Sequence, residues 1–345
     1  MKLWKTITAA ALAATLLLGG CANDTSADEP QNSAATAESS GSFFSVADTT
    51  AADTTSAEGD ISPMMWKITG SQGNTLYLFG TIHAGDERND TVLTYLQDEL
   101  DSVDSLAVEF DVEAFESDTA QQTKIAMMLM YTDGTTAKDH IRADLYEKCV
   151  DYLTENNKYS PTYDYLMSGY WITMLEQIAI EKSDLQTDNA IDTKLIDYAK
   201  AHGKSVLDIE SAESQFTMIK DFPDKLIEMQ IESFFEGGEE EFSQGINEMY
   251  QKWLSGDEEA LSELEYGTDE EEYGKLTDEE KKLLEDYNKA MLTDRNIGMA
   301  EKADEYLKSG KSVFFAVGTG HMVSDKGVVQ LMKDKGYTVE RVSTH

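Results

Sequence analysis

The sequence predicts an α/β domain with strands at both ends and a large helical insertion between them. Short apolar runs bounded by turn residues, which indicate buried strands, occur within residues 66–110 and 312–342. Between residues 115 and 308 most of the chain has helical periodicity, interrupted by one short strand-like run. Strands at the ends and helices in the middle are typical of a sheet covered by helices.

The first elements are predicted to be a hairpin. Residues 66–68 and 75–79 are apolar strand-like runs, and residues 70–74 between them are rich in turn-forming types. Asp90 is placed to cap a helix that runs to about Asp101. Residues 105–110 then form a buried strand that contains an acid, Glu109.

Helices are expected next, over residues 115–202, with Pro161 at the start of one of them. A short strand, 204–210, ends in Glu210, and helices follow to about residue 308. The last elements are a strand, a helix and a strand, predicted over residues 312–317, 326–335 and 337–342.

The N-terminus is that of an exported lipoprotein. Lys2 and Lys5 precede an apolar run, 7–18, that is too short to span a bilayer and has the length of a signal-peptide core. Leu18-Gly19-Gly20-Cys21 follows and predicts cleavage before Cys21, with lipid attached to that cysteine. An ordinary signal peptide with a chance cysteine is the alternative. We therefore expect a protein anchored by lipid to the extracytoplasmic face of the cell membrane.

Three segments are predicted along the chain. Residues 1–20 form the signal peptide, and residues 21–62 form a disordered tether rich in Ser, Thr and Asp. Residues 63–345 form one folded domain, without a second apolar run long enough to span a membrane. Once Cys21 carries lipid, Cys149 has no partner for a disulfide, and we expect it to serve packing.

The chain is strongly acidic, with a formal net charge of −38. This balance excludes nucleic acid and anionic lipid as partners, because both require a basic surface. Residues 257–286 alone hold fourteen acids and three lysines, and we interpret this stretch as a solvated face.

Two histidines share one local pattern. An apolar strand-like run leads into Gly80-Thr81-Ile82-His83, and another leads into Gly318-Thr319-Gly320-His321. Glycine lets the backbone turn as it leaves a strand, and ligand sites in open α/β sheets lie at the carboxyl ends of strands. We therefore expect His83 and His321 to share one site, although a lone histidine at a strand end is more often structural.

The other histidines are expected to play no part in the site. His140 and His202 are predicted to lie at helix ends, in structural or surface roles, and His345 is the terminal residue.

The acids that follow strands extend the candidate site. Two imidazoles with Glu109 or Glu210 form a mixed nitrogen and oxygen set that suits Mn, Co or Zn better than Ca or Mg. A metal bound by such a set lowers the pKa of water and so generates hydroxide near neutral pH. The remaining glutamate is then a candidate general base.

The chain resembles the TraB/PrgY/GumN family, which includes the Tiki proteins, over about residues 64–343. The order and spacing of several short segments carry the resemblance: 66–68, 76–83, 107–111, 209–211 with Gln215, 294–296 with Met299, and 318–321. Ile209-Glu210-Ser211 departs mildly from the Leu-Glu-Thr that is frequent in the family, and the acidic stretch 257–286 is specific to this chain. Neither departure removes a candidate ligand.

The resemblance implies a fold similar to the erythromycin-esterase and ChaN-like proteins. It implies His83, His321 and Glu109 as the family's two GxxH histidines and acid, and Arg295 with Asn296 as a helical pair that holds a substrate carboxylate or carbonyl. Tiki proteins are metal-dependent proteases that use Mn or Co, PrgY-like proteins restrain peptide pheromone signalling, and GumN-like lipoproteins have no settled activity.

Three functions follow as hypotheses. The first is a metal-dependent hydrolase of peptide-like substrates at the cell surface. The second is a lipoprotein that sequesters a peptide or small molecule without turnover, for which the acidic surface favours a cationic or zwitterionic ligand. The third is metal-free hydrolysis with a histidine as general base, whose activity would survive EDTA.

Overall fold

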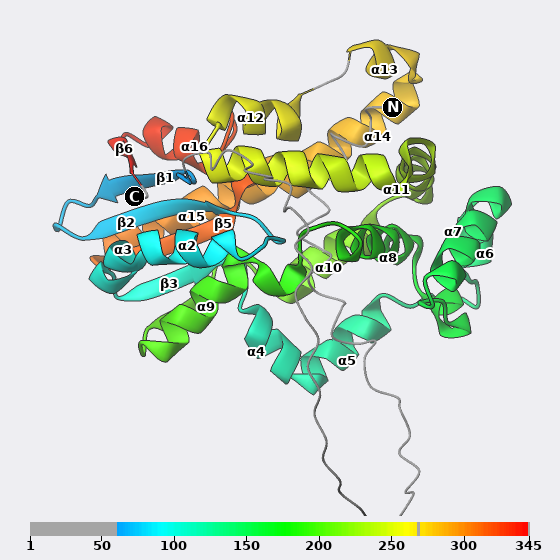
Figure 1. Ribbon diagram of the computed structural model, residues 1–345, viewed down its shortest axis with the longest axis horizontal. Helices are drawn as coiled ribbons and strands as arrows, with labels where there is room; N and C mark the ends of the chain where they lie inside the picture. Colours follow the sequence, from blue (N-terminus) through cyan, green and yellow to red (C-terminus); the bar gives the residue numbers. More distant parts are fainter. Residues whose placement is uncertain (1–60, 268–269, 344–345) are drawn as a thin grey trace, which may run out of the picture.

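The computed structural model describes residues 61–267 and 270–343. The predicted signal peptide, Cys21, nearly all of the tether and His345 lie outside the described residues. The described part is a mixed α/β fold built on a six-stranded sheet (Figure 1). The strands are β1 (Met65–Thr69), β2 (Thr75–Thr81), β3 (Ser105–Val108), β4 (Ser205–Asp208), β5 (Val313–Gly318) and β6 (Val339–Val342).

The strand order in the sheet is β4-β3-β5-β2-β1-β6. The hairpin of β1 and β2 is confirmed, and β6 joins its outer edge antiparallel to β1. The four strands β4, β3, β5 and β2 are parallel, so their carboxyl ends meet at one edge of the sheet. Thr81 at the end of β2 lies opposite Gly318 at the end of β5, which brings the two glycine-containing loops together.

Two strands are shorter than the sequence indicated. β3 ends at Val108 and β4 at Asp208, so Glu109 and Glu210 lie just beyond the strands that lead to them. The backbone N–H of Glu210 donates to the Glu109 carbonyl at 2.8 Å, which continues the parallel pairing past the ends of the strands. The two glutamates are therefore neighbours at the rim of the sheet.

Helices make up most of the rest of the fold. The α-helices of the described residues are α2 (Arg88–Tyr95), α3 (Gln97–Ser102), α4 (Val112–Ser117), α5 (Thr119–Met128), α6 (Ala137–His140), α7 (Ala143–Glu155), α8 (Ser168–Glu181), α9 (Ile191–Ala201), α10 (Ala212–Asp221), α11 (Asp224–Ser255), α12 (Glu258–Tyr266), α13 (Glu270–Lys275), α14 (Asp278–Asn288), α15 (Asp294–Ser309) and α16 (Val328–Asp334). Short helical turns are η2 (Pro161–Tyr165), η3 (Thr187–Asn189), η4 (Lys289–Thr293) and η5 (Thr319–His321).

The helical insertion is divided into two parts by β4. Helices α4 to α9 lie between β3 and β4 in the sequence, and α10 to α15 lie between β4 and β5. In space, α6, α7 and α8 lie away from the sheet, and the long α11 connects them to it (Figure 1). The helix predicted over residues 90–101 is two helices, α2 and α3, and Asp90 lies inside the first turn of α2 instead of capping it.

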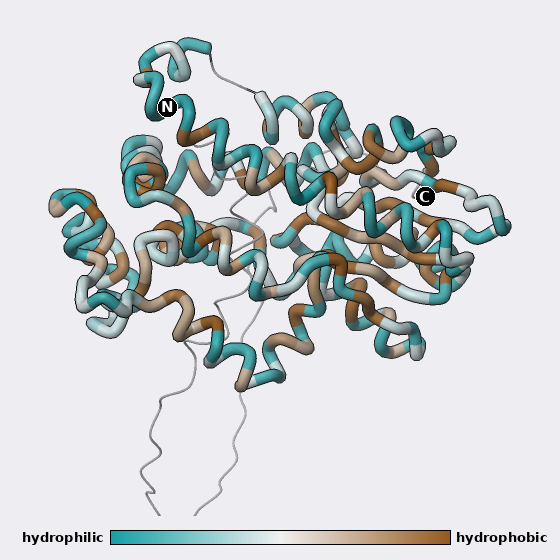
Figure 2. The backbone as a smooth tube through the Cα atoms, turned by 180° about the vertical axis from the view of Figure 1, so that it is seen from behind, coloured by the Kyte–Doolittle hydropathy of each residue, from teal (hydrophilic) through white to brown (hydrophobic). Residues whose placement is uncertain are grey.

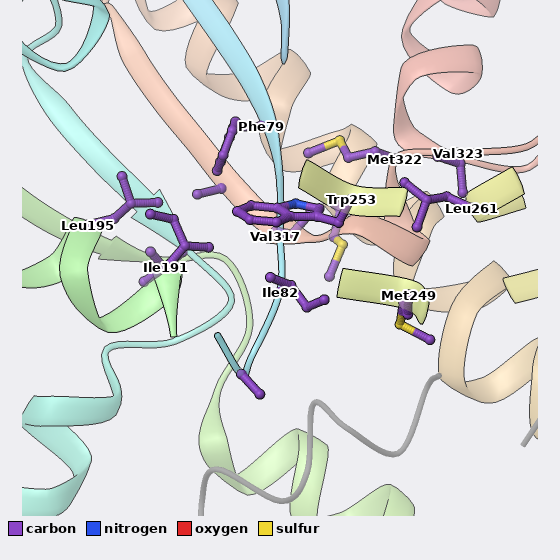
Figure 3. Close-up of a cluster of buried hydrophobic side chains, with 14 of the residues drawn as sticks. Phe79, Ile82, Ile191, Leu195, Met249, Trp253, Leu261, Val317, Met322 and Val323 are labelled. Carbon is purple, nitrogen blue, oxygen red and sulfur yellow. The ribbon is translucent and has the colours of Figure 1, made fainter. Parts of the chain in front are cut away.

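Apolar packing holds α11 and α12 against the ends of β2 and β5. Trp253 of α11 is fully buried beside Phe79, and its indole N–H donates to the Gly80 carbonyl at 2.7 Å. Figure 3 shows Trp253 beside Ile82 and Val317. Ile82 immediately precedes His83 of the first loop, and Val317 immediately precedes Gly318 of the second. Burial of a large aromatic side chain together with its polar hydrogen fixes the helix relative to the loops.

The outer faces of the molecule are polar. Figure 2 shows brown, apolar segments concentrated in the strands and teal, polar segments over much of the helices. Within the described residues, no helix combines the length and apolar character needed to cross a membrane. Cys149 of α7 is buried, and burial raises the pKa of its thiol to about 12, as expected for a cysteine that serves packing.

Glu176 of α8 is a buried acid without a partner. Its side chain is 1% exposed, and neither carboxyl oxygen has a hydrogen-bond partner. Burial raises the pKa of Glu176 well above its usual value of 4.5. The fold therefore keeps this group protonated at pH values where the unfolded chain ionises it. The part of the free energy of unfolding that depends on protonation of Glu176 is greatest below the unfolded pKa of about 4.3. It decreases as the pH rises toward the folded pKa.

We expect Glu176→Gln to stabilise the protein near neutral pH, with no gain in acid, because glutamine cannot ionise. Urea denaturation at a series of pH values measures the effect. Glu147→Gln, an exposed change on α7, is the control and leaves the pH profile unchanged. Equal pH slopes for the wild type and Glu176→Gln would show that this carboxyl does not govern the profile.

Candidate functional site

The two histidine loops are in direct contact at the carboxyl edge of the sheet. A Cβ placed on Gly80 would lie 2.8 Å from Thr319 Oγ1 and 3.1 Å from Thr319 Cα. Only glycine allows this approach, since the Thr319 backbone cannot move away without shifting β5. The hydroxyls of Thr81 and Thr319 are buried here without hydrogen-bond partners. The structure therefore brings the two predicted loops together.

His83 is oriented by an acid from a distant helix. Its Nδ1 donates to Asp192 Oδ2, in the first turn of α9, at 3.1 Å. Burial alone would lower the pKa of His83, but the Asp192 carboxylate and the charge of Glu109 raise it to about 9. The second ring nitrogen, Nε2, remains free of the Asp192 contact and faces Gly318.

His321 is oriented by an amide. Its Nδ1 lies 2.6 Å from Asn296 Oδ1, and Asn296 Nδ2 donates to the Lys326 carbonyl at 3.0 Å. Because that carbonyl can only accept, the amide orientation is settled and Nδ1 of His321 must be the donor. Burial and the nearby Arg295 cation lower the pKa of His321 to about 3. The neutral ring thus keeps a lone pair on Nε2, which lies 3.9 Å from Glu109 Oε1.

The candidate ligands His83, His321 and Glu109 all lie close to Gly318. A Cβ built on it would lie 3.3 Å from Glu109 Oε1, 3.6 Å from His83 Nε2 and 3.6 Å from the His321 Cδ2 atom. The absence of a side chain at Gly318 therefore leaves a space bordered by all three predicted ligands. Two of the three come from loops separated by most of the domain in sequence.

Glu109 is held by a network of donors. Its Oε2 accepts from Arg295 Nη2 at 2.6 Å and from Gln215 Nε2 at 2.9 Å, and its Oε1 accepts from the Gly318 N–H at 2.8 Å. Burial by itself would raise the pKa of Glu109, but the Arg295 cation holds it well below its usual range. Glu109 is therefore a fixed carboxylate.

Arg295 connects both strand-end glutamates. Its Nε donates to Glu210 at 3.0 Å and its Nη2 donates to Glu210 Oε2 at 2.7 Å, while Nη1 donates to the Met291 carbonyl at 3.3 Å. Gln215 also donates to Glu210 Oε2, at 3.0 Å. Each nitrogen of the 7% exposed guanidinium thus has an internal acceptor. The adjacent residues Arg295 and Asn296 of α15 therefore have different partners. Arg295 holds the two glutamates, and Asn296 orients His321.

A cavity of about 510 Å³ borders this network. Its walls come from α10, η4 and α15 and include both Arg295 and Glu210. Its lining combines the apolar Ile209, Met218 and Ala290 with the acids Asp294, Glu301 and Glu305 and with Lys302. The volume lies in the range of cavities that bind small molecules or peptide side chains.

The donor set agrees with a metal site in its chemistry. Both imidazoles have Nδ1 hydrogen-bonded to an outer acceptor, as metal-binding histidines usually do. Nε2 of His83 borders the space at Gly318, and Nε2 of His321 lies 3.9 Å from Glu109 Oε1. As placed, no three His, Cys, Asp or Glu side chains of the described residues are close enough together to hold an ion. Binding would therefore draw the side chains inward from their present positions.

Two residues of the site had no signal in the sequence. Asp192 lies 109 residues from His83 and occupies an ordinary position in a helix. Glu265 of α12 is 4% exposed, so the interpretation of 257–286 as a solvated face is wrong at this position. Burial raises the pKa of Glu265 to about 7, and the nearby charge of His83 opposes part of that rise.

The remaining histidines lie outside the site. His140 ends α6, contacts Asp224 Oδ2 at 2.8 Å and stacks on Tyr131. His202 caps the end of α9 and is exposed. Both have the helix-end positions that the sequence predicted.

Comparison with known proteins identifies a family. The model of the TraB/PrgY/gumN family matches residues 64–341, which include both histidine loops, Glu109, Glu210 and the Arg295-Asn296 pair. No curated protein and no solved structure matches the chain. Because the family match covers well over half of the sequence, this protein belongs to the TraB/PrgY/gumN family.

Proposed function

We propose that the protein is a metal-dependent hydrolase of peptide or peptide-like substrates, anchored by lipid on Cys21 to the extracytoplasmic face of the cell membrane. The observation that carries the catalytic proposal is the pair of imidazoles at Gly318, each with Nδ1 held by an outer acceptor. The signal-peptide pattern of residues 1–20 supports the location.

The residues proposed to hold the metal are His83, His321 and Glu109. When bound, Mn, Co or Zn would supply a Lewis acid and lower the pKa of a water molecule. Asn296 keeps the neutral His321 ring in the tautomer that leaves Nε2 available. Asp192 accepts from Nδ1 of His83, so the proton on Nε2 of His83 would be released when a metal binds there. Arg295 and Gln215 keep Glu109 ionised and fixed in place.

Glu210, Arg295 and Asn296 act as positioning residues in this proposal. Both oxygens of Glu210 accept hydrogen bonds from Arg295, which in turn holds Glu109. The sequence had suggested Arg295 as a holder of substrate and Glu210 as a general base. Their mutual hydrogen bonds favour support of Glu109 over direct contact with the substrate.

The adjacent cavity supports a peptide-like substrate. It is lined by Arg295 and Glu210 but not by His83, His321 or Glu109, so it would hold a part of the substrate that lies beyond the metal ligands. The lipid anchor and tether would present this opening to peptides outside the membrane.

The test is cleavage of a defined mixture of short peptides, followed by mass spectrometry, with Mn²⁺, Co²⁺ or Zn²⁺ supplied in turn. We expect new peptide termini in the wild type, loss of products with EDTA, and loss in His321→Ala. His202→Ala is the matched control and retains activity. Intact peptides under every metal condition would reject hydrolysis, and tight binding of those intact peptides would favour sequestration. Products that persist in EDTA would favour metal-free catalysis.

A further inference from the structure

Helix α12, inside the acidic stretch, is anchored to the second histidine loop. Leu261 of α12 is buried near Met322 and Val323, which follow His321 (Figure 3). At the end of the helix, the Tyr266 hydroxyl donates to the Gly320 carbonyl at 2.8 Å. These contacts fix the last turn of α12 beside the site.

Glu265 reaches the loop from that last turn. A Cβ built on Gly320 would lie 2.9 Å from both Cδ and Oε2 of Glu265, so the carboxyl occupies the space that a side chain at position 320 would fill. Glu265 is 4% exposed, and its Oε2 is buried without a hydrogen-bond partner. A buried acceptor without a partner is unfavourable, so this oxygen is open to a ligand.

Glu265 differs in its ion pairing from Glu109 and Glu210, the other two carboxylates of the site. Glu109 and Glu210 both form ion pairs with Arg295, at 2.6 Å and 2.7 Å. Their negative charge is therefore compensated within the protein. Among the described residues, no arginine or lysine forms an ion pair with Glu265, and the charge that acts on it is that of His83.

An anionic oxygen ligand favours binding of a divalent ion, and Glu265 would add a carboxylate that no arginine or lysine of the described residues neutralises. We infer that Glu265 is a further carboxylate ligand of the proposed metal site, contributed by helix α12 of the acidic stretch. The assignment rests on the proposed function, because it presupposes a metal bound by His83 and His321. Glu265 joins two histidines and Glu109 in a mixed nitrogen and oxygen set suited to Mn, Co or Zn.

The test is direct titration of the protein with Co²⁺, followed by calorimetry and by the visible absorption of the bound ion. Four proteins are compared: the wild type, Glu265→Gln, Glu263→Gln and His321→Ala. Glu263 is exposed on the same helix and provides the matched control. Thermal melting of the metal-free proteins separates a ligand from a structural residue.

We expect Glu265→Gln to weaken Co²⁺ binding by at least about tenfold and to change the absorption spectrum, while its metal-free melting temperature is unchanged or higher. Glu263→Gln should match the wild type. Wild-type affinity and spectrum in Glu265→Gln, with binding lost in His321→Ala, would overturn the role of Glu265 and leave the metal site intact. Absence of Co²⁺, Mn²⁺ and Zn²⁺ binding in the wild type would instead reject the proposed metal dependence itself.

Discussion

Replacing Arg295 with methionine is expected to destabilise the protein by about 3–5 kcal/mol, because it leaves buried carboxylates without their cation. Arg295 is 7% exposed and pairs with Glu109, which is 8% exposed, and with Glu210. Methionine preserves much of the side-chain volume, so the loss reports the charge network more than a cavity. Urea denaturation at neutral pH measures the change in the free energy of unfolding.

The control for this prediction is Lys289→Met. Lys289 forms an exposed ion pair with Asp294 next to the same helix, and exposed pairs contribute at most about 1 kcal/mol. Adding Glu109→Gln to Arg295→Met should recover part of the lost stability, since it removes one of the unpaired charges. A destabilisation below about 1 kcal/mol in Arg295→Met would contradict a buried network held by this guanidinium.

Changes at the histidine loops are expected to have the largest effect on metal affinity. His83→Ala and His321→Ala each remove a proposed ligand, and we expect binding to weaken by more than about 100-fold. Asn296→Ala removes only the acceptor that orients His321, so a smaller loss of about 10–100-fold is expected. Calorimetric titration with Mn²⁺, Co²⁺ and Zn²⁺ measures these differences.

His140→Ala is the matched control for the loop variants. His140, like His83, has an aspartate beside its Nδ1, but it lies on α6 outside the site. Equal affinities for His321→Ala and His140→Ala would show that the Gly318 space does not bind the metal.

The pairing of the two loops was predictable from the sequence because it depends on local chemistry. An apolar strand followed by Gly-Thr-x-His specifies where the backbone turns, and parallel strands place such turns at one edge. The strands lie where the short runs predicted them, although β3 and β4 end two residues earlier than predicted. The similarity to erythromycin-esterase and ChaN-like folds stays a prediction, as do the lipid anchor and the metal.

Contacts that depend on tertiary packing could not be predicted. Asp192 and Glu265 lie on helices whose sequences do not distinguish them from neighbouring acids, and only the packing of α9 and α12 brings them to the loops. Likewise, the sequence identified Arg295 but not its partners, because Glu109 lies 186 residues away along the chain. The short strand β4 was predicted, but its pairing with β3 is non-local and was not.

The most direct test of the account is an anomalous-scattering map from crystals of the protein grown with Mn²⁺, Co²⁺ or Zn²⁺. The account predicts one peak beside Gly318, with Nε2 of His83 and Nε2 of His321 each within about 2.1 Å of a zinc or cobalt ion. A map without a peak at this position, under conditions where the metal saturates the crystal, would contradict a shared metal site of the two histidine loops.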